Sequence, residues 1–194
     1  MATASGSGPS PAEERCRPLG GDDLGWAATL ADRELGGRFQ ARLGRLVDAL
    51  DGSGLVAEDA AGRPIGLVTW LVEGEDSGPR EGEVRILVVE PASRRHGVAG
   101  RLLTAAERAM DAAGAVRAWL VTTNDNVAAL AFYQGRGWQL SRLLPGAVDE
   151  ARRTLKPAIA LVGENGLPIR DEIVLAKDLR RAAAGGLGDA ATYT

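Results

Sequence analysis

Two stretches of the chain decide its fold: residues 84–100 read VRILVVEPASRRHGVAG, and residues 126–138 read NVAALAFYQGRGW. The first starts as an apolar strand, passes a Pro-containing turn and two arginines, and ends in the small-residue start of a helix. A helix N-terminus presents unpaired N–H groups and a partial positive charge, both of which attract anions. Gly97, Ala99 and Gly100 would let a phosphate approach the backbone closely. The pattern predicts a phosphate-binding turn, although a glycine-rich turn before an ordinary surface helix would look the same.

The phosphate-binding turn is not one of the two common nucleotide motifs. It lacks the Gly-Lys-Ser/Thr of a P-loop and the G-x-G-x-x-G spacing of a dinucleotide fingerprint. Residues 90–117 carry five arginines against three acidic residues, in a chain whose net charge is −3. This local positive surplus favours an anionic ligand at the turn.

Composition limits the function classes. The 194 residues are 45% hydrophobic and 25% charged, which is typical of a soluble globular protein. The net charge of −3 argues against a nucleic-acid partner. Cys16 is the only cysteine, so we expect an inert free thiol in a tail, no intrachain disulfide and no metal site. The sequence has no apolar run of about 20 residues and no secretory signal, so we expect no membrane partner and a cytoplasmic location.

Hydrophobic periodicity predicts one domain over residues 16–180, between flexible tails at 1–15 and 181–194. We expect strands over residues 17–19, 55–58, 64–72, 83–89, 116–122, 138–144 and 172–179. We expect helices over residues 24–30, 37–50, 98–113, 125–135 and 147–155. The helix over 37–50 rests on the helical spacing of Phe39, Leu43, Leu46, Val47 and Leu50. The order of elements predicts a mixed α/β sheet.

The spacing Arg94-x-x-Gly97-x-Ala99 resembles the Gln/Arg-x-x-Gly-x-Gly/Ala signature of the GNAT superfamily of N-acetyltransferases. Asn126-x-x-Ala129-x-x-Phe132-Tyr133-x-x-x-Gly137-Trp138 resembles the second signature of that family. The resemblance implies a GNAT-like fold, in which helices flank a mostly antiparallel sheet with one splayed parallel strand pair, here 83–89 and 116–122. It also implies an enzyme that transfers an acetyl group from acetyl-CoA to an amine.

The resemblance assigns the cofactor-binding residues. The backbone of the first splayed strand would bind the pantetheine arm, and the N–H of Val89 would polarise the thioester carbonyl. The N–H groups of 95–100 would hold the pyrophosphate, and Asn126 would contact the pantetheine arm. The expected cofactor-binding residues are Leu87, Val88, Val89, Arg94, Arg95, His96, Gly97, Val98, Ala99, Gly100 and Asn126.

The resemblance assigns Tyr133 as the general acid that protonates the leaving thiolate, whereas the residue pattern alone favours a core tyrosine on an amphipathic helix. Glu83 is the candidate general base, with Asp125 and Glu172 in reserve, and Glu83 would also fit a plain strand-edge charge. His96, the only histidine, falls on an unspecified position of the signature, so we expect it beside the phosphates rather than in the chemistry.

Direct attack of a primary amine on the thioester in a ternary complex needs no protein nucleophile, which suits a chain with one cysteine. The acceptor amine, a small molecule or a protein, is not identified by the sequence, and a homodimer stays open. The alternative function is a regulatory module of the same fold that binds acyl-CoA without turnover.

Overall fold

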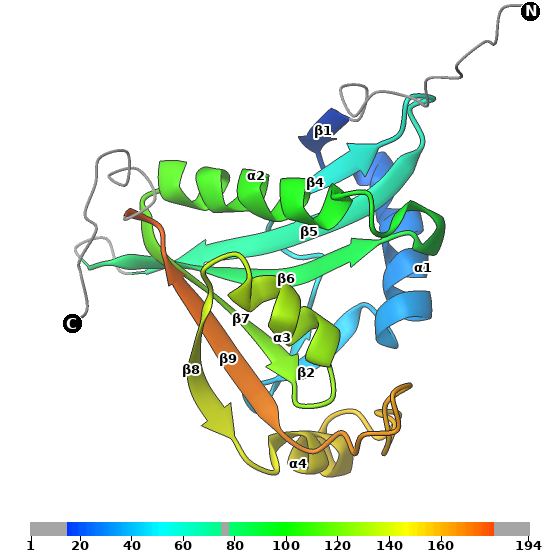
Figure 1. Ribbon diagram of the computed structural model, residues 1–194, viewed down its shortest axis with the longest axis vertical. Helices are drawn as coiled ribbons and strands as arrows, with labels where there is room; N and C mark the ends of the chain where they lie inside the picture. The colour runs from blue at the N-terminus through cyan, green and yellow to red at the C-terminus, as the bar shows by residue number, and fades with distance from the viewer. Residues whose placement is uncertain (1–14, 75–77, 181–194) are drawn as a thin grey trace, which may run out of the picture.

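The computed structural model describes residues 15–74 and 78–180, arranged around a seven-stranded sheet of order β1-β4-β5-β6-β7-β9-β8 (Figure 1). Every neighbouring pair is antiparallel except β6 and β7, which run parallel. The strands are β1 (Arg15–Pro18), β4 (Ser53–Glu58), β5 (Pro64–Glu73), β6 (Arg80–Val89), β7 (Ala115–Thr123), β8 (Gln139–Leu144) and β9 (Glu172–Asp178). The mixed sheet with one parallel pair is confirmed.

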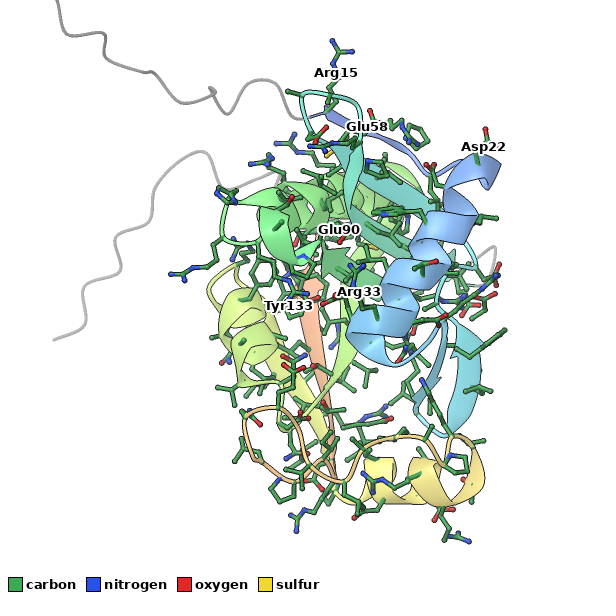
Figure 2. The ribbon with its side chains drawn as sticks, turned by 90° about the vertical axis from the view of Figure 1, so that its right-hand side faces the viewer. Arg15, Asp22, Arg33, Glu58, Glu90 and Tyr133 are labelled. Carbon is green, nitrogen blue, oxygen red and sulfur yellow. The ribbon has the colours of Figure 1, made fainter. Side chains whose placement is uncertain are left out.

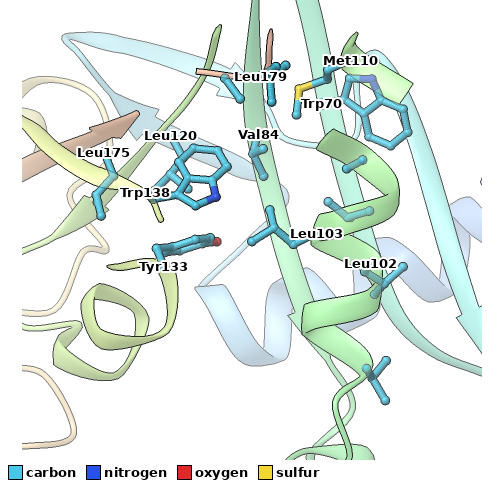
Figure 3. Packing of buried hydrophobic residues seen from close by; sticks show 14 of the residues in the cluster. Trp70, Val84, Leu102, Leu103, Met110, Leu120, Tyr133, Trp138, Leu175 and Leu179 are labelled. Atoms are coloured by element: carbon cyan, nitrogen blue, oxygen red, sulfur yellow. The ribbon is translucent and has the colours of Figure 1, made fainter. Parts of the chain in front are cut away.

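Four helices surround this sheet: α1 (Leu24–Leu35), α2 (Val98–Ala112), α3 (Val127–Gln134) and α4 (Ala147–Thr154). The apolar side of α2, with Leu102, Leu103 and Met110, packs in one core with β5, β6 and β7. The apolar side of α1, with Leu30, packs in a second core that includes Ile86 of β6. The helices α1 and α2 therefore cover opposite faces of the sheet, and Figure 3 shows the core on the α2 side.

The helix expected over residues 37–50 is wrong. The structure has a two-stranded hairpin there, β2 (Phe39–Arg42) and β3 (Arg45–Asp48). Leu43 and Gly44 form its turn with φ of 49° and 73°, the left-handed backbone that two-residue hairpin turns require. The helical spacing was misleading because Phe39 and Leu46 are 53% and 48% exposed and so do not form a buried face.

Most of the two expected tails lies outside the described residues, because residues 1–14 and 181–194 are not described. Arg15 and Cys16 instead begin β1, which pairs with β4. The expectation that Cys16 lies in a tail is therefore wrong. Its side chain is a free, exposed thiol on an edge strand, and partial burial raises its pKa.

The long connection between α4 and β9 is fixed by hydrogen bonds from side chains to its backbone. The guanidinium of Arg152 donates to the carbonyl oxygens of Ile159, Ala160 and Ile169 at 2.9, 2.8 and 2.7 Å. Oδ1 of Asn124, which follows β7, accepts the N–H groups of Arg170 and Asp171, both at 2.9 Å. The connection is therefore held against the carboxyl end of β7.

We expect the packing of α2 on the sheet to dominate stability. Leu102 is 0% exposed, so Leu102→Ala should lower the free energy of unfolding by about 2–5 kcal/mol through a core cavity. The matched control is Leu140→Ala on β8, because Leu140 is 59% exposed and its loss should cost about 0.5 kcal/mol or less. Urea unfolding measures both, and equal midpoints for the two variants would contradict this packing.

Candidate active site

The strands β6 and β7 separate part of the way along their length. They pair from Arg80↔Ala115 to Glu83↔Trp119, after which β6 continues to Val89 beside β5 alone and β7 continues to Thr123 beside β9 alone. Figure 1 shows the two strands diverging. The sheet is thus split between its two halves.

A cavity of about 510 Å³ occupies this split. Ala129 and Tyr133 of α3 line it on the sheet face that α2 covers. Glu172 of β9 lines it on the opposite face, because side chains alternate along a strand and the next residue, Ile173, packs in the core on the α2 side. Arg42 of the hairpin also lines the cavity. The cavity is therefore lined by residues from both faces of the sheet.

The outer part of β6 offers a free backbone edge to the cavity. Glu90 N–H donates to Ile65 O at 2.9 Å, and backbone groups point to alternate sides along a strand. The backbone groups of Val88 therefore face β5, while those of Leu87 and Val89 face the split. A chain-like ligand with amide groups can extend the sheet along this edge.

A β-bulge lies where the strands part. Thr69 pairs with Ile86 and Trp70 with Val84, so Arg85 is an extra residue in β6. Its carbonyl oxygen accepts a hydrogen bond from Arg42 at 2.8 Å. The bulge bends β6 away from the straight course that pairing with β7 would require.

Glu83 is held by two guanidinium groups beside this bulge. Its Oε1 accepts from Arg42 at 3.0 Å and its Oε2 from Arg85 at 3.1 Å. All three side chains are about 90% buried or more. Burial lowers the pKa of Arg42, whereas Glu83 opposes that shift. Glu83 thus lies beside the cavity but within an ion-pair network.

The predicted phosphate-binding turn is a sharp bend whose N–H groups are open to a ligand. A short 3-10 helix, Pro91–Ser93, follows β6, and Arg95 and Gly97 then take positive φ of 67° and 83°. Gly97 is the N-cap of α2, and the backbone ladder begins only where Arg101 donates to Gly97 O at 3.1 Å. The N–H groups of the first helical turn therefore have no partner within the helix.

The side chain of Arg94 points back into the fold rather than toward a ligand at this turn. Its Nε donates to Val89 O at 3.1 Å, and its Nη2 forms an ion pair with Glu34 of α1. Arg33 of the same helix pairs with Glu90 at 2.5 Å, and Figure 2 shows these two residues side by side. Arg94 thus belongs to a network that ties α1 to the end of β6.

Arg136, which the sequence analysis missed, approaches the first turn of α2. A Cβ built on Gly100 would lie 2.9 Å from Arg136 Nη2. The guanidinium carbon lies 3.9 Å from the ring centre of Phe132, and Nη1 donates to Phe132 O at 3.1 Å. The missing side chain at Gly100 makes room for a fixed positive charge beside the open N–H groups. In the sequence, the only indication of a role for Arg136 was its position between two glycines inside the second signature.

Tyr133 lies in the wall of the cavity, only 9% exposed. Its ring packs against Trp138 at 5.6 Å between centroids, and Figure 3 shows the two rings next to each other. Desolvation raises the pKa of the phenol above its ordinary value. No described residue hydrogen-bonds to the hydroxyl, so it stays protonated and available to a ligand.

Asn126, another predicted binding residue, is the N-cap of α3. Its Oδ1 accepts the N–H of Ala129 at 3.2 Å, which fixes the start of the helix that carries Tyr133. The residue also lines the cavity.

The far side of the cavity is closed by the hairpin and by the connection before β9. Lys156 donates to Phe39 O at 2.8 Å and joins the two. Burial lowers the pKa of Lys156. Glu172 accepts the N–H of Leu43, at the hairpin tip, at 2.9 Å. Because a helix was wrongly expected in place of the hairpin, nothing in the local pattern indicated that Arg42 or Leu43 would lie here.

Comparisons with known proteins agree with this geometry. Residues 24–138 match the Acetyltransferase (GNAT) family. Two uncharacterized proteins of Bacillus subtilis (strain 168) are similar over much of their length. YdhI is 42% identical over 130 residues, which is 67% of this chain and 75% of YdhI. YxbD is 39% identical over 133 residues, which is 69% of this chain and 77% of YxbD.

Among solved structures, Arabidopsis thaliana Naa50 in complex with the bisubstrate analogue CoA-Ac-MVNAL superposes with a TM-score of 0.65. The match covers 86% of this chain and 99% of that one at 16% identity, so it supports the fold alone.

A split parallel pair, an open helix start after it and a cavity through the sheet define an acyltransferase fold that binds an acyl-CoA. This chain belongs to the GNAT acetyltransferase family and is an N-acetyltransferase, which transfers an acetyl group from acetyl-CoA to an amine. Over the described ranges, 15–74 and 78–180, no helix is long and apolar enough to cross a membrane.

The turn before α2 provides a direct test of cofactor binding. Gly97→Val should weaken acetyl-CoA binding about tenfold or more, because a branched side chain at φ 83° both strains the turn and enters the space above the open N–H groups. Calorimetry measures the Kd. Gly114→Val is the matched control, because Gly114 has φ 87° at the opposite end of α2. Equal Kd values for the two variants would contradict the assignment.

Proposed function

We propose that acetyl-CoA binds along the split with its pyrophosphate at the start of α2 and that an amine enters from the opposite face. The single observation that carries this proposal is the cavity that joins the two faces between β6 and β7. The pantetheine amides would pair with the backbone of Leu87, which leaves the N–H of Val89 for the thioester carbonyl. The N–H groups from Arg95 to Gly100, with the charge of Arg136, would hold the phosphates.

This arrangement supports direct transfer in a ternary complex. The neutral amine attacks the thioester carbon, the N–H of Val89 stabilises the oxygen that becomes negative, and the C–S bond breaks. Tyr133 donates a proton to the departing sulfur. Burial raises the pKa of the Tyr133 phenol, so Tyr133 keeps its proton across the neutral pH range and can act as an acid there.

The proposal covers one catalytic domain over residues 16–180, which acts in the cytoplasm on a primary amine. The cavity lining includes two positively charged residues, Lys156 and Arg42, and two acidic residues, Glu34 and Glu172. Its charge therefore does not favour a small amine over a peptide N-terminus as the acceptor. An acceptor panel therefore has to include both classes.

Thiol release from acetyl-CoA tests the function. The panel contains spermidine, glucosamine, phenethylamine and a peptide that begins with the MVNAL sequence of the Naa50 analogue. We expect one class to raise thiol release well above hydrolysis by water and to yield the N-acetylated product by mass spectrometry. Tight acetyl-CoA binding with no acetylated product from any acceptor would favour a binding module without turnover.

Tyr133→Phe tests the general acid. The change should lower kcat about 100-fold, within the range typical of proton transfer, because it removes only the hydroxyl. The ring keeps its contact with Trp138, so the Kd for acetyl-CoA should stay within about twofold. Leu140→Ala on β8, outside the lining of this cavity, is the control and should leave both kcat and Kd unchanged. Unchanged kcat in Tyr133→Phe would remove this residue from the mechanism.

A further inference from the structure

Two buried glutamates lie at or near the proposed acceptor side of the cavity, in different surroundings. Glu83 and Glu172 are 8% and 2% exposed. Glu83 pairs with Trp119 just before β6 and β7 part, whereas Glu172 of β9 pairs with Thr123 at the far end of β7. Only Glu172 lines the cavity.

Glu83 is poorly placed to accept a proton. Both of its oxygens accept hydrogen bonds from buried guanidinium groups, those of Arg42 and Arg85. Protonation would break this pairing and leave two buried positive charges with less compensation. Glu83 is better explained as the residue that neutralises these arginines and fixes the β-bulge.

Glu172 has one oxygen in use and one available. Its Oε2 accepts the N–H of Leu43 at 2.9 Å. Its Oε1 accepts no hydrogen bond from any residue in the described part of the chain, and no described cation forms an ion pair with it. A buried carboxylate with an open oxygen at a cavity wall is suited to bind a cationic group there.

The charged groups that face Glu172 come from several elements. Arg42 of β2 and Arg142 of β8 stabilise its ionised form, whereas burial acts against that form and is the larger effect. Burial therefore raises the pKa of Glu172 above its ordinary value. Lys156 also lines the cavity, but it is held by Phe39 O.

We propose that Glu172 is the general base of this acetyltransferase, which binds the ammonium group of the acceptor and removes its proton. This inference rests on the proposed function. It assigns the acceptor as an amine that arrives protonated, and it places acid and base on opposite faces of the sheet, with Tyr133 on one and Glu172 on the other.

The proton transfers balance. The Glu172 carboxylate takes one proton from R–NH₃⁺, and the freed lone pair forms the C–N bond as the C–S bond breaks. The sulfur takes the proton of Tyr133, and the second nitrogen proton returns to the phenolate through water. Glu172 then releases its proton to solvent, so the net products are the acetamide, CoA thiol and one proton.

The same carboxylate also anchors the hairpin tip through Leu43, so the test must separate the two roles. Glu172→Gln keeps an oxygen that can accept the Leu43 N–H but cannot take a proton. The matched control is Glu73→Gln, which changes an exposed glutamate at the end of β5, outside the cavity lining. Urea unfolding should give the same midpoint for both variants as for the wild type.

The decisive measurement is the pH profile of kcat/KM with the best acceptor of the amine panel. A base with a raised pKa is deprotonated above that pKa, so wild-type activity should rise through it and then remain level up to the pKa of the amine. In Glu172→Gln only the free amine can react. Its kcat/KM should fall about 100-fold near neutral pH and rise tenfold per pH unit toward the amine pKa.

A Glu172→Gln profile of wild-type height would overturn the proposal. So would a profile lowered by the same factor at every pH, because that is the result of a structural role alone. In both cases wild-type turnover persists, which separates this failure from failure of the proposed function. Loss of transfer in the wild type itself, with every acceptor of the panel, would overturn both.

Discussion

The site depends on the point where β6 and β7 stop pairing, just after Glu83 and Trp119. Beyond it each strand keeps its antiparallel partner, β5 for β6 and β9 for β7, so the two halves of the sheet diverge as stable units. A buried strand edge normally has to be paired, because unpaired N–H and C=O groups cost free energy when they lose water. Here the edge of β6 borders a cavity, so under the proposed function those groups would pair with the cofactor.

Buried charged residues stabilise the geometry of the split between β6 and β7. Arg42 of the hairpin reaches across to Glu83 and to the carbonyl of Arg85, and so fixes the hairpin against the β-bulge. Pairing offsets the cost of burying these groups, but it also occupies them. Glu172 is buried to a similar degree and lacks such a partner among the described residues, and this asymmetry separates a structural carboxylate from one that can exchange a proton. At the start of α2 a similar division holds: Arg94 ties the turn to α1, while the backbone N–H groups of the first helical turn have no partner within the helix.

Local patterns predicted the elements whose periodicity agrees with their burial. The apolar side of α2 and the buried strand β6 appear at nearly the expected residues. The hairpin at 39–48 was missed because tertiary contacts override the helical spacing of its apolar residues. Phe39 and Leu46 are exposed, and Leu43 takes a left-handed backbone that most residues avoid. Its tip is held instead by a hydrogen bond to Glu172, which lies 129 positions away in the chain. No local pattern can encode such a contact.

The sequence by itself determined the family, the order of strands and helices around the split, and the turn at Gly97 that suits a phosphate, because these depend on residues close together in the chain. Only the tertiary structure decided which charged groups are available to a ligand. In the sequence alone, Arg94, Glu83 and Glu172 are equally plausible ligand-binding residues. Their partners in the structure, Glu34, Arg42 and Leu43, come from distant segments. A buried ionisable group is defined by what surrounds it, and that environment exists only after the distant segments have packed together.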